Sequence, residues 1–431
     1  MPTPIRIDAD DVPRLLRPGM IVFVEGSTAE PLPLAEALAR APEASAGVTY
    51  AGVLIPGINR FDYAGLHPEA RAVAFFVGPA QRASFAAGRV RLLPLHYSAQ
   101  YAWLETVCPV DLALIQVAPP DAAGNCSLGA VADFVPAVLG KAGRIVAEVN
   151  ARMPALPGAP SVSYGRLDYV VETDRPLIEV ADEGGGADEI ASIAENAAAL
   201  IRDGDTVQIG IGRVQNTILS RLADRRHIGF HSGMITDAVM DLVRAGALTG
   251  ARKSRDWGRI VTGAAVGTQA LYDFLRSGGE GAGLVDMRPV SYTHAATVLA
   301  GIDDFVSINS ALEVDLLGQV NCETIGGRQV SGVGGFVDFV RGARLSKGGR
   351  SIVAFGATGK RGAVSRIVAR LGEGAVVSSL RSDIDCVVTE HGVAALRDRS
   401  VDERAEALVE IAAPQFRDGL QQAWREMRAR M

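Results

Sequence analysis

One glycine-rich segment of the 431-residue chain has the composition of a ligand-binding loop. Gly210, Ile211 and Gly212 separate an apolar run from a helical pattern that begins near Val214. Glycines between a strand and a helix let backbone N–H groups approach a ligand closely at the helix N-terminus. The segment is neither a G-x-G-x-x-G motif nor a Walker loop, so by itself it is more typical of a tight packing turn.

A second glycine-rich segment lies further along the chain. Gly332, Gly334 and Gly335 form a loop that could lie against a ligand. Lys347, in the segment SKGGR, could meet a phosphate as a point charge.

A histidine marks the end of an apolar run between these loops. The run ends at His231, Ser232 and Gly233, and helical spacing with Thr236 as a candidate N-cap follows. In open α/β sheets ligands bind beyond the carboxyl ends of strands. His231 is therefore a candidate acid or base, although a histidine whose ring is bonded by the local backbone is the commoner finding.

Two carboxylates alternate with apolar residues near the second loop. Glu313 and Asp315 are interleaved with Leu312, Val314 and Leu316, which predicts a strand with one polar face. Two carboxylates on one face could share acid–base work. The commoner explanation is solubility at a sheet edge or capping of nearby backbone groups.

Metal-ligand spacing is missing from the sequence. The histidines are scattered, and the pair His227 and His231 falls in a predicted strand, where residues four apart lie too far from each other to share an ion easily. No C-x-x-C pair occurs, and the cysteines are predicted to be reduced, buried thiols; they are Cys108, Cys126, Cys322 and Cys386. We therefore expect no metal.

Short apolar runs alternate with alanine-rich helical segments along the whole chain. This alternation predicts an α/β fold with largely parallel sheets. The clearest boundary combines acidic residues with Gly184, Gly185 and Gly186, a composition typical of a flexible connector. We predict two open α/β domains, over residues 1–185 and 186–431. The apolar runs cover residues 20–24, 73–77, 112–117, 144–149, 206–211, 305–308, 351–355 and 386–389, and the helical segments include 32–41 and 187–201.

Composition excludes several classes of function. Hydrophobic residues make up 48% and charged residues 21% of the chain, which is the balance of a globular protein. The net charge is -6 and no basic stripe occurs, so nucleic acid is not an expected partner. Neither a secretory signal pattern nor an apolar run of transmembrane length is present, which predicts a cytoplasmic protein that does not bind membranes.

Four segments together resemble one known family. Residues 305–355, 376–417, 124–134 and 146–154 are similar to motifs of the acetyl-CoA hydrolase/transferase family, which includes 4-hydroxybutyrate, butyrate and succinate CoA-transferases. The resemblance spans nearly the whole chain in the expected order. It is far more specific than either glycine loop.

The resemblance implies a fold and a reaction. Members of this family have two open α/β domains that face each other across a cleft, and they form homodimers or larger homo-oligomers. A glutamate attacks an acyl-CoA, giving an acyl-glutamyl anhydride and then a glutamyl-CoA thioester, and a second carboxylate completes the exchange. The loops at Gly210–Gly212 and Gly332–Gly335 are expected to line the CoA and the developing oxyanion. Coenzyme A enters as a substrate, and no other cofactor is expected.

The chain departs from the family at the nucleophile. The family carries its glutamate in a His-Ser/Thr-Glu-Met segment, and this chain has His231, Ser232, Gly233 and Met234 there. Gly233 thus takes the place of the nucleophile and has no side chain. A glutamyl thioester cannot form at this position.

Three hypotheses follow from the missing carboxylate. Water or another small acceptor could attack the thioester directly, with His231, Asp237 or Glu313 as the base. Alternatively, Glu313, Glu323 or Glu390 could replace the lost nucleophile and preserve CoA transfer to a carboxylate. In the third hypothesis the protein binds acyl-CoA without catalysis. We expect the first of these, an atypical acyl-CoA transferase or hydrolase.

Overall fold

The computed structural model describes residues 3–181, 188–276 and 278–431, and packing divides the chain into two compact units. Unit 1 comprises Met1–Ala181, Met234–Asp237 and Val261–Thr293, and unit 2 comprises Asp182–Gly233, Ala238–Ile260 and His294–Met431. The predicted connector at Gly184–Gly186, and with it the boundary at residue 185, lies outside the described residues. Two later segments of the chain also belong to unit 1, so the units are not continuous in sequence.

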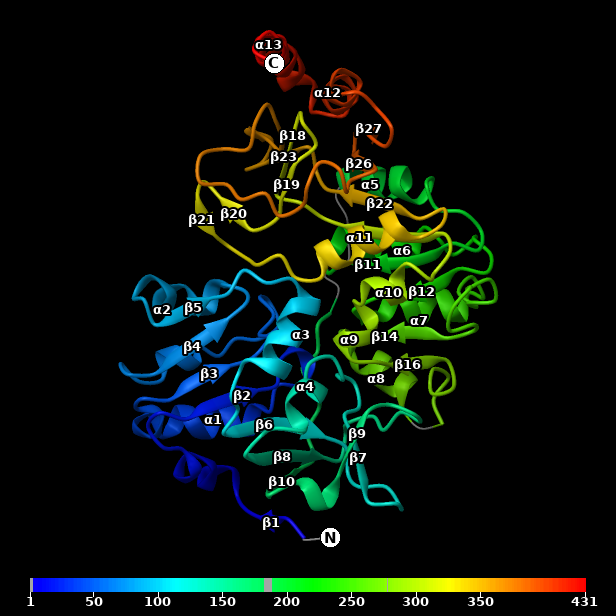
Figure 1. The fold of residues 1–431 in the computed structure, drawn as a ribbon. Coiled ribbons are helices and arrows are strands. Elements are labelled where there is room, and N and C mark those ends of the chain that lie inside the picture. The colour runs from blue at the N-terminus through cyan, green and yellow to red at the C-terminus, as the bar shows by residue number, and fades with distance from the viewer. Residues whose placement is uncertain (1–2, 182–187, 277) are drawn as a thin grey trace. The chain divides into compact units, whose positions relative to one another are not determined.

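Unit 1 is built on a parallel sheet (Figure 1). Its neighbouring strands all run in the same direction. The central strand β6 is buried along its whole length, as expected for a parallel strand covered on both faces. In spatial order the strands are β1 (Ile5–Arg6), β10 (Tyr169–Thr173), β8 (Arg144–Asn150), β6 (Leu112–Val117), β2 (Ile21–Val24), β3 (Thr49–Ala51), β4 (Arg71–Ala74) and β5 (Val90–Leu92).

Helical spacing explains how α1 (Leu32–Arg40) packs on this sheet. Leu34 and Leu38 lie one turn apart on its buried face and pack in one core with Val22 and Val24 of β2. The other α-helices of this unit are α2 (Arg82–Ala86), α3 (Tyr97–Thr106), α4 (Pro136–Leu139), α8 (Gln269–Leu275) and α9 (Val290–Thr293). Its 3-10 helices are η1 (Ala9–Leu15), η2 (Ser27–Ala29), η3 (Pro42–Ser45), η4 (Tyr63–Gly65), η5 (Pro79–Gln81) and η6 (Tyr164–Arg166).

Unit 2 also contains a parallel sheet. In spatial order its strands are β12 (Gly229–His231), β11 (Thr206–Ile209), β17 (Phe305–Asn309), β22 (Arg350–Ala354), β26 (Cys386–Thr389) and β27 (Gly392–Ala395). Only the pairing of β26 with β27 among these described strands is antiparallel. The predicted α/β fold with mostly parallel sheets is confirmed.

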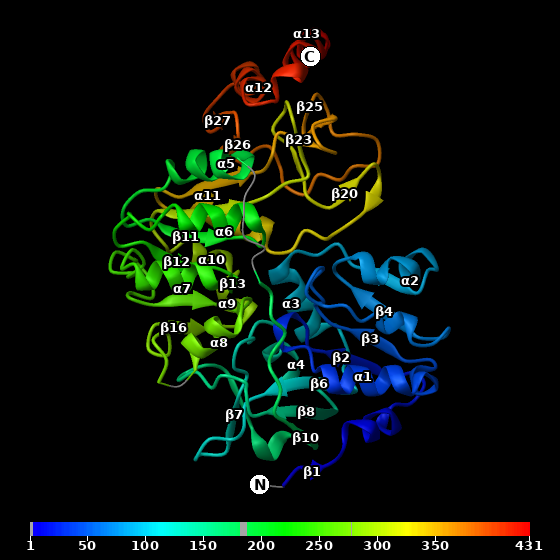
Figure 2. The same cartoon turned by 180° about the vertical axis from the view of Figure 1, so that it is seen from behind.

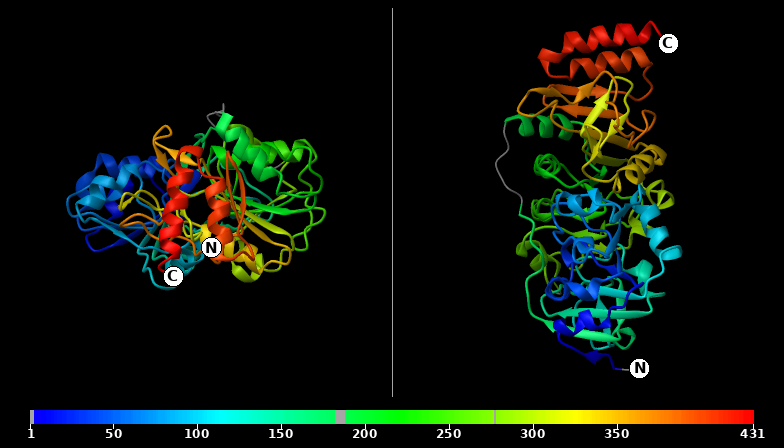
Figure 3. Two further views of the ribbon diagram at one scale, coloured as in Figure 1. Left: turned by 90° about the horizontal axis from the view of Figure 1, so that it is seen from above. Right: turned by 90° about the vertical axis from the view of Figure 1, so that its left-hand side faces the viewer.

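Helices cover both faces of the unit 2 sheet. α10 (Ala296–Leu299) and α11 (Phe336–Leu345) lie on one face (Figure 1), and α5 (Asp188–Ala198) and α6 (Arg213–Ser220) lie on the other (Figure 2). The C-terminal helices α12 (Val401–Glu410) and α13 (Pro414–Arg428) pack side by side (Figure 3). α12 begins with a capping box in which Ser400 and Glu403 bond each other's backbone N–H groups.

The remaining elements are short. They are α7 (Asp237–Arg244), β14 (Ile260–Thr262), β16 (Val285–Met287), the antiparallel pair β7 (Asn125–Ser127) and β9 (Ser161–Ser163), the parallel pair β13 (Met234–Ile235) and β15 (Ala264–Ala265), the group β18 (Glu313–Asp315), β19 (Val320–Asn321) and β25 (Ile367–Val368), and the hairpins β20 (Thr324–Ile325) with β21 (Arg328–Gln329) and β23 (Thr358–Gly359) with β24 (Val364–Ser365).

The described residues contain free thiols and no membrane-spanning helix. Cys108, Cys126, Cys322 and Cys386 are free, and burial raises the pKa of each thiol, to about 12 for Cys322. Among the described helices, none combines the length and the apolar character that a membrane crossing requires.

Candidate active site

The predicted chemistry-bearing residues of unit 2 follow the ends of its parallel strands. Gly210 directly follows β11, and Gly233 lies two residues beyond β12. Because the carboxyl ends of parallel strands meet at one edge of a sheet, these two segments share that edge. Lys347 precedes β22 instead, so it lies at the opposite edge, where its side chain is exposed. The structure therefore does not bring Lys347 to the glycine loops.

The first glycine loop turns the chain from β11 into α6. The N–H of Gly210 donates to the carbonyl of Ile308 at 3.0 Å, which extends the ladder between β11 and β17. Gly212 is the N-cap of α6 and has a φ of 137°, a conformation that side-chain-bearing residues rarely adopt. Ile211, between the two glycines, is 47% exposed. The loop thus presents exposed backbone at the start of a helix, as predicted.

The second glycine loop leads into α11. Gly335 is the N-cap of this helix, and Gly334 before it has a φ of 59°. The hydroxyl of Ser331 donates to the carbonyl of Gly332 at 3.4 Å. Both predicted loops therefore end at a helix N-terminus, where backbone N–H groups can meet an anion.

A histidine that the sequence analysis did not single out lies beside Gly233. His294 is 3% exposed and lies between α9 and α10. A Cβ built on Gly233 would lie 2.9 Å from Cε1 and 3.1 Å from Nε2 of this ring. A Cβ on Gly335 would lie 2.7 Å from Cδ2 and still closer to Nε2. The imidazole of His294 thus occupies space that side chains at both glycines would need.

Aromatic rings hold this imidazole in place. The ring of His294 packs against Phe339, with 4.4 Å between centroids and 45° between planes. Phe339 in turn lies 6.4 Å from Phe305, and His231 meets Phe305 edge-on at 6.3 Å. His231 itself is fully buried. The structure therefore places the predicted His231 in the packed interior and His294 next to the glycines.

The predicted carboxylate bases already bond to neighbouring groups. The carboxylate of Asp237 accepts hydrogen bonds from the N–H and the hydroxyl of Thr268, at 3.0 and 2.7 Å. Glu313 accepts one from the side-chain amide of Asn321 at 2.9 Å. Asp315 accepts backbone bonds from the turn that follows β18, at 3.0 and 2.9 Å. Glu313 and Asp315 thus have separate local partners.

The predicted replacement carboxylates are bonded in the same way. Glu323 accepts from the hydroxyl of Ser378 at 2.8 Å, and Glu390 accepts from the N–H of Ala357 at 2.9 Å. Among the described residues, the atoms nearest to a Cβ on Gly233 belong to His294 and Phe339. None of the candidate carboxylates approaches the vacated position as closely as the imidazole does.

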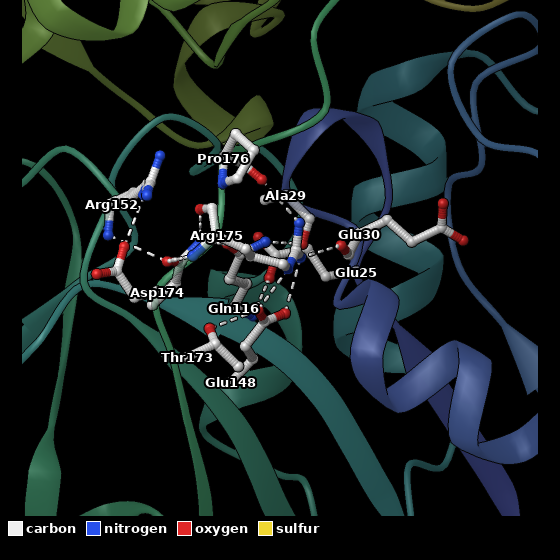
Figure 4. Close-up of polar contacts among 11 residues, drawn as sticks. Glu25, Ala29, Glu30, Gln116, Glu148, Arg152, Thr173, Asp174, Arg175 and Pro176 are labelled. Carbon is white, nitrogen blue, oxygen red and sulfur yellow. Dashed lines mark hydrogen bonds and ion pairs between the residues drawn. The ribbon is translucent and has the colours of Figure 1, made fainter.

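Unit 1 has a different set of groups at the carboxyl edge of its sheet (Figure 4). Glu148 on β8 is fully buried and accepts two hydrogen bonds from Arg175, at 2.6 and 2.8 Å. Glu25, directly after β2, accepts the N–H of Gln116 at 2.6 Å. Burial raises the pKa of the Glu25 carboxyl well above its usual range.

A further carboxylate of this edge anchors its loops. Glu30 accepts hydrogen bonds from Asn59 at 3.0 Å and from Tyr63 at 2.9 Å, and burial raises its pKa. No sequence signal marks Glu25, Glu30 or Glu148, because isolated acids within or after short strands resemble ordinary residues of a sheet or surface. Elsewhere in unit 1, burial raises the pKa of Asp133 to about 7.

Metal binding has no support in the described residues. Among them, no group of three or more histidine, cysteine, aspartate and glutamate side chains could hold an ion.

The N-terminal and C-terminal domain models of one family both match this chain. The acetyl-CoA hydrolase/transferase N-terminal domain matches residues 6–181, and the C-terminal domain of the same family matches residues 267–424. Gly233 lies between the two matched segments.

The names of two relatives describe a coenzyme A transferase and an acetyl-CoA hydrolase. The chain is 40% identical over 401 residues to the 4-hydroxybutyrate coenzyme A transferase of Clostridium kluyveri, an alignment that covers 93% of this chain and 92% of that protein. It is also 21% identical over 344 residues to the acetyl-CoA hydrolase of Neurospora crassa, covering 70% of this chain and 63% of that one.

Solved structures share the fold. RipA from Yersinia pestis aligns with a TM-score of 0.91 and 32% identity over 98% of each chain. A 4-hydroxybutyrate CoA-transferase from Porphyromonas gingivalis aligns with a TM-score of 0.81 and 33% identity, covering 99% of this chain and 98% of that one.

The fold and the similarity to CoA-transferases define an enzyme of the CoA-transferase type, with open, mostly parallel α/β units. The chain belongs to the acetyl-CoA hydrolase/transferase family. The predicted family and the predicted class of enzyme, an acyl-CoA transferase or hydrolase, are confirmed.

Proposed function

We propose that this protein cleaves an acyl-CoA thioester by direct attack of water or another small acceptor, without a glutamyl-CoA intermediate. The observation that carries the proposal is Gly233, which has no side chain where the family resemblance expects the glutamate. Without a carboxylate at this position, no anhydride with the enzyme can form there. A smaller nucleophile must attack the carbonyl carbon itself.

The glycine loops supply the rest of such a reaction. In the proposal, backbone N–H groups near Gly212 and Gly335, at the starts of α6 and α11, bind the oxyanion that develops as the carbonyl is attacked. Coenzyme A is a substrate and leaves as the thiol. No further cofactor enters the reaction.

Free thiol release tests the proposal directly. Acetyl-, propionyl- and butyryl-CoA are incubated with the protein, with and without carboxylate acceptors, and free CoA and exchanged acyl-CoA are followed. Thiol release without a carboxylate acceptor supports direct attack. Borohydride, which reduces a glutamyl thioester, should leave activity unchanged in the presence of acyl-CoA.

A second candidate function is conventional CoA transfer to a carboxylate. It is favoured by the 40% identity to the 4-hydroxybutyrate coenzyme A transferase of Clostridium kluyveri, which covers most of both chains. Glu313, Glu323 or Glu390 would then act as the substitute nucleophile. Exchange that requires an acceptor, together with borohydride inactivation that requires acyl-CoA, would establish this function and refute the first. Tight CoA binding with neither activity would identify a non-catalytic acyl-CoA-binding protein.

Assembly and location extend the proposal. We expect a homodimer or larger homo-oligomer, as the family resemblance implies. We also expect a cytoplasmic location, because free cysteines are typical of that compartment. Light scattering on the purified full-length chain tests the assembly, and a monomeric mass at micromolar concentration would contradict it.

A further inference from the structure

We propose that His294 is the general base of this enzyme, acting through Nε2 beside Gly233. This inference rests on the proposed function, because it assigns a base to the direct attack on the thioester. No motif in the sequence marks His294, and its role follows from the position of its ring.

Gly233 and Gly335 make room for this ring, and the backbone conformation at these two positions does not itself require glycine. Gly335 has a φ of -86°, which any residue adopts, and Gly233 also lies outside the left-handed region. Neither position therefore needs glycine for its backbone. What excludes a side chain at each is the imidazole, because a Cβ on Gly233 would lie 2.9 Å from Cε1 and one on Gly335 would lie 2.7 Å from Cδ2.

The ring has little freedom to move away. It is 3% exposed and packs against Phe339, whose Cε2 would lie 3.1 Å from a Cβ on Gly335. Phe339 is one turn along α11 from Gly335 and donates its N–H to the carbonyl of that residue at 3.1 Å. The helix thus fixes both the glycine and the aromatic ring that hold the imidazole, as a base must be held to work efficiently.

The other candidate bases are less suitable. No atom of His231, Asp237 or Glu313 is among the three atoms nearest to a Cβ on Gly233. Of these described candidates, His294 alone places a basic nitrogen next to that position, at 3.1 Å.

The reaction balances with one base and one water. Nε2 of His294 takes a proton from water as the water oxygen bonds to the carbonyl carbon of the thioester. The carbonyl oxygen becomes an oxyanion beside the first turn of α11, where backbone N–H groups stabilise negative charge. Collapse of this intermediate breaks the C–S bond, and the CoA sulfur takes the proton from the imidazolium. The products are a carboxylic acid and CoA thiol.

Replacement of His294 by glutamine tests the assignment. His294→Gln should lower kcat for thiol release by about 10²- to 10⁴-fold, the usual contribution of a general base, with a much smaller change in KM. His227→Gln is the matched control, because His227 is an exposed histidine of the same unit, before β12. The control should retain full activity.

Rescue by added imidazole and the pH dependence of kcat distinguish a catalytic role of His294 from a purely structural one. In His294→Ala the removed ring leaves a cavity, and added imidazole should restore part of the lost rate. Wild-type kcat should fall on acidification with a single protonation, and this step should be absent from the residual activity of His294→Gln. A His294→Gln variant that keeps at least half of the wild-type kcat would overturn the proposal, as would a folded His294→Ala variant that imidazole does not rescue.

The two proposals fail in different ways. If the wild-type protein releases no thiol from any acyl-CoA, the proposed function is refuted before His294 is tested. If the wild type releases thiol and the His294 variants do so equally well, only the assignment of the base is wrong.

Discussion

The two units build the carboxyl edges of their parallel sheets from opposite kinds of residue. Unit 1 places the carboxylates Glu25, Glu30 and Glu148 there, and unit 2 places glycines and the imidazole of His294. The acids of unit 1 accept hydrogen bonds from loops and neighbouring strands. The glycines of unit 2 leave backbone and a basic nitrogen close together. The comparison shows that the groups best known for acid–base chemistry can serve structure, while residues without side chains leave room for the packed ring of His294.

The electrostatic reason lies in burial. A buried carboxylate costs free energy unless it is paired or protonated. Glu148 is paired with Arg175, whereas burial raises the pKa of Glu25 well above its usual range. These acids are therefore tuned to their surroundings in the folded protein. We interpret them as structural.

The largest expected effect is a change of reaction route. Gly233→Glu alone should give no acceptor-dependent CoA exchange, because its Cβ would lie 2.9 Å from the ring of His294. Gly233→Glu combined with His294→Ala removes that ring and should create exchange through a glutamyl thioester. Exchange and borohydride inactivation in the presence of acyl-CoA measure the outcome. Full exchange in the single variant would show that the ring moves aside readily.

The next effect concerns the acids of unit 1. Arg175→Ala leaves the fully buried carboxylate of Glu148 without its cation and should lower the free energy of unfolding by about 3–5 kcal/mol. Arg152→Ala is the control, because its pair with Asp174 is solvent-exposed and is expected to contribute at most about 1 kcal/mol. Denaturant unfolding compares the two variants. Equal losses would contradict the structural role assigned to Glu148.

A smaller effect tests the packing around the imidazole. Gly335→Ala should lower stability by about 1–3 kcal/mol through overpacking, and His294→Ala in the same chain should relieve most of that loss. Gly419 in α13 has no atom within 4 Å of its Cβ position, so Gly419→Ala should stabilise the helix by about 0.5–1 kcal/mol. Thermal unfolding is measured for Gly335→Ala, His294→Ala and the double variant, which with the wild type form the double-mutant cycle, and for Gly419→Ala as the control. Additive losses at Gly335 and His294 would mean that the ring does not limit this position.

A further expected effect is a pH dependence of stability that arises in unit 1. Burial raises the pKa of Asp133 from 3.8 to about 7, so the folded state keeps a proton that the unfolded state loses in this window. The contribution of Asp133 to stability is therefore fully present below pH 3.8 and is lost as pH rises to about 7. Asp133→Asn should flatten that decline.

Unfolding free energies measured from about pH 2.5 to pH 8 test this prediction. Part of the decline should persist in Asp133→Asn, because the pKa of Glu25 is raised as well. Glu403→Gln is a control of opposite sign, since hydrogen bonds at the start of α12 lower the pKa of Glu403 to about 2 and its contribution is lost as pH falls. An unchanged slope in Asp133→Asn would contradict the raised pKa.

Much of the fold was predictable because its signals are local. The run predicted over residues 112–117 is β6, and the helical segment predicted over 32–41 is α1, which ends at Arg40. Hydrophobic period and length identify such elements without tertiary information. The run predicted over 73–77 begins earlier, as β4 at Arg71, because the pairing with β3 sets that boundary.

The site was predictable only in part. Gly212 lies at a helix start, as expected from its place between an apolar run and a helical pattern. Gly335 also lies at a helix start, which was not predicted from the sequence. Lys347 lies at the other edge of the sheet because it precedes β22, and this depends on which end of a strand it flanks. His294 gave no signal, since its neighbours form no motif. A vacated position at Gly233 does imply that some other group fills the space, although not which one.

The sequence by itself determined the α/β architecture, the glycine turns and the absence of a side chain at residue 233, because these depend on residue type and local spacing. Only the tertiary structure decided that the ring of His294 lies against Gly233 and Gly335 and that the candidate acids bond elsewhere. Those contacts join segments far apart in the chain, and the packing of α11 against β17 and β22 brings them together.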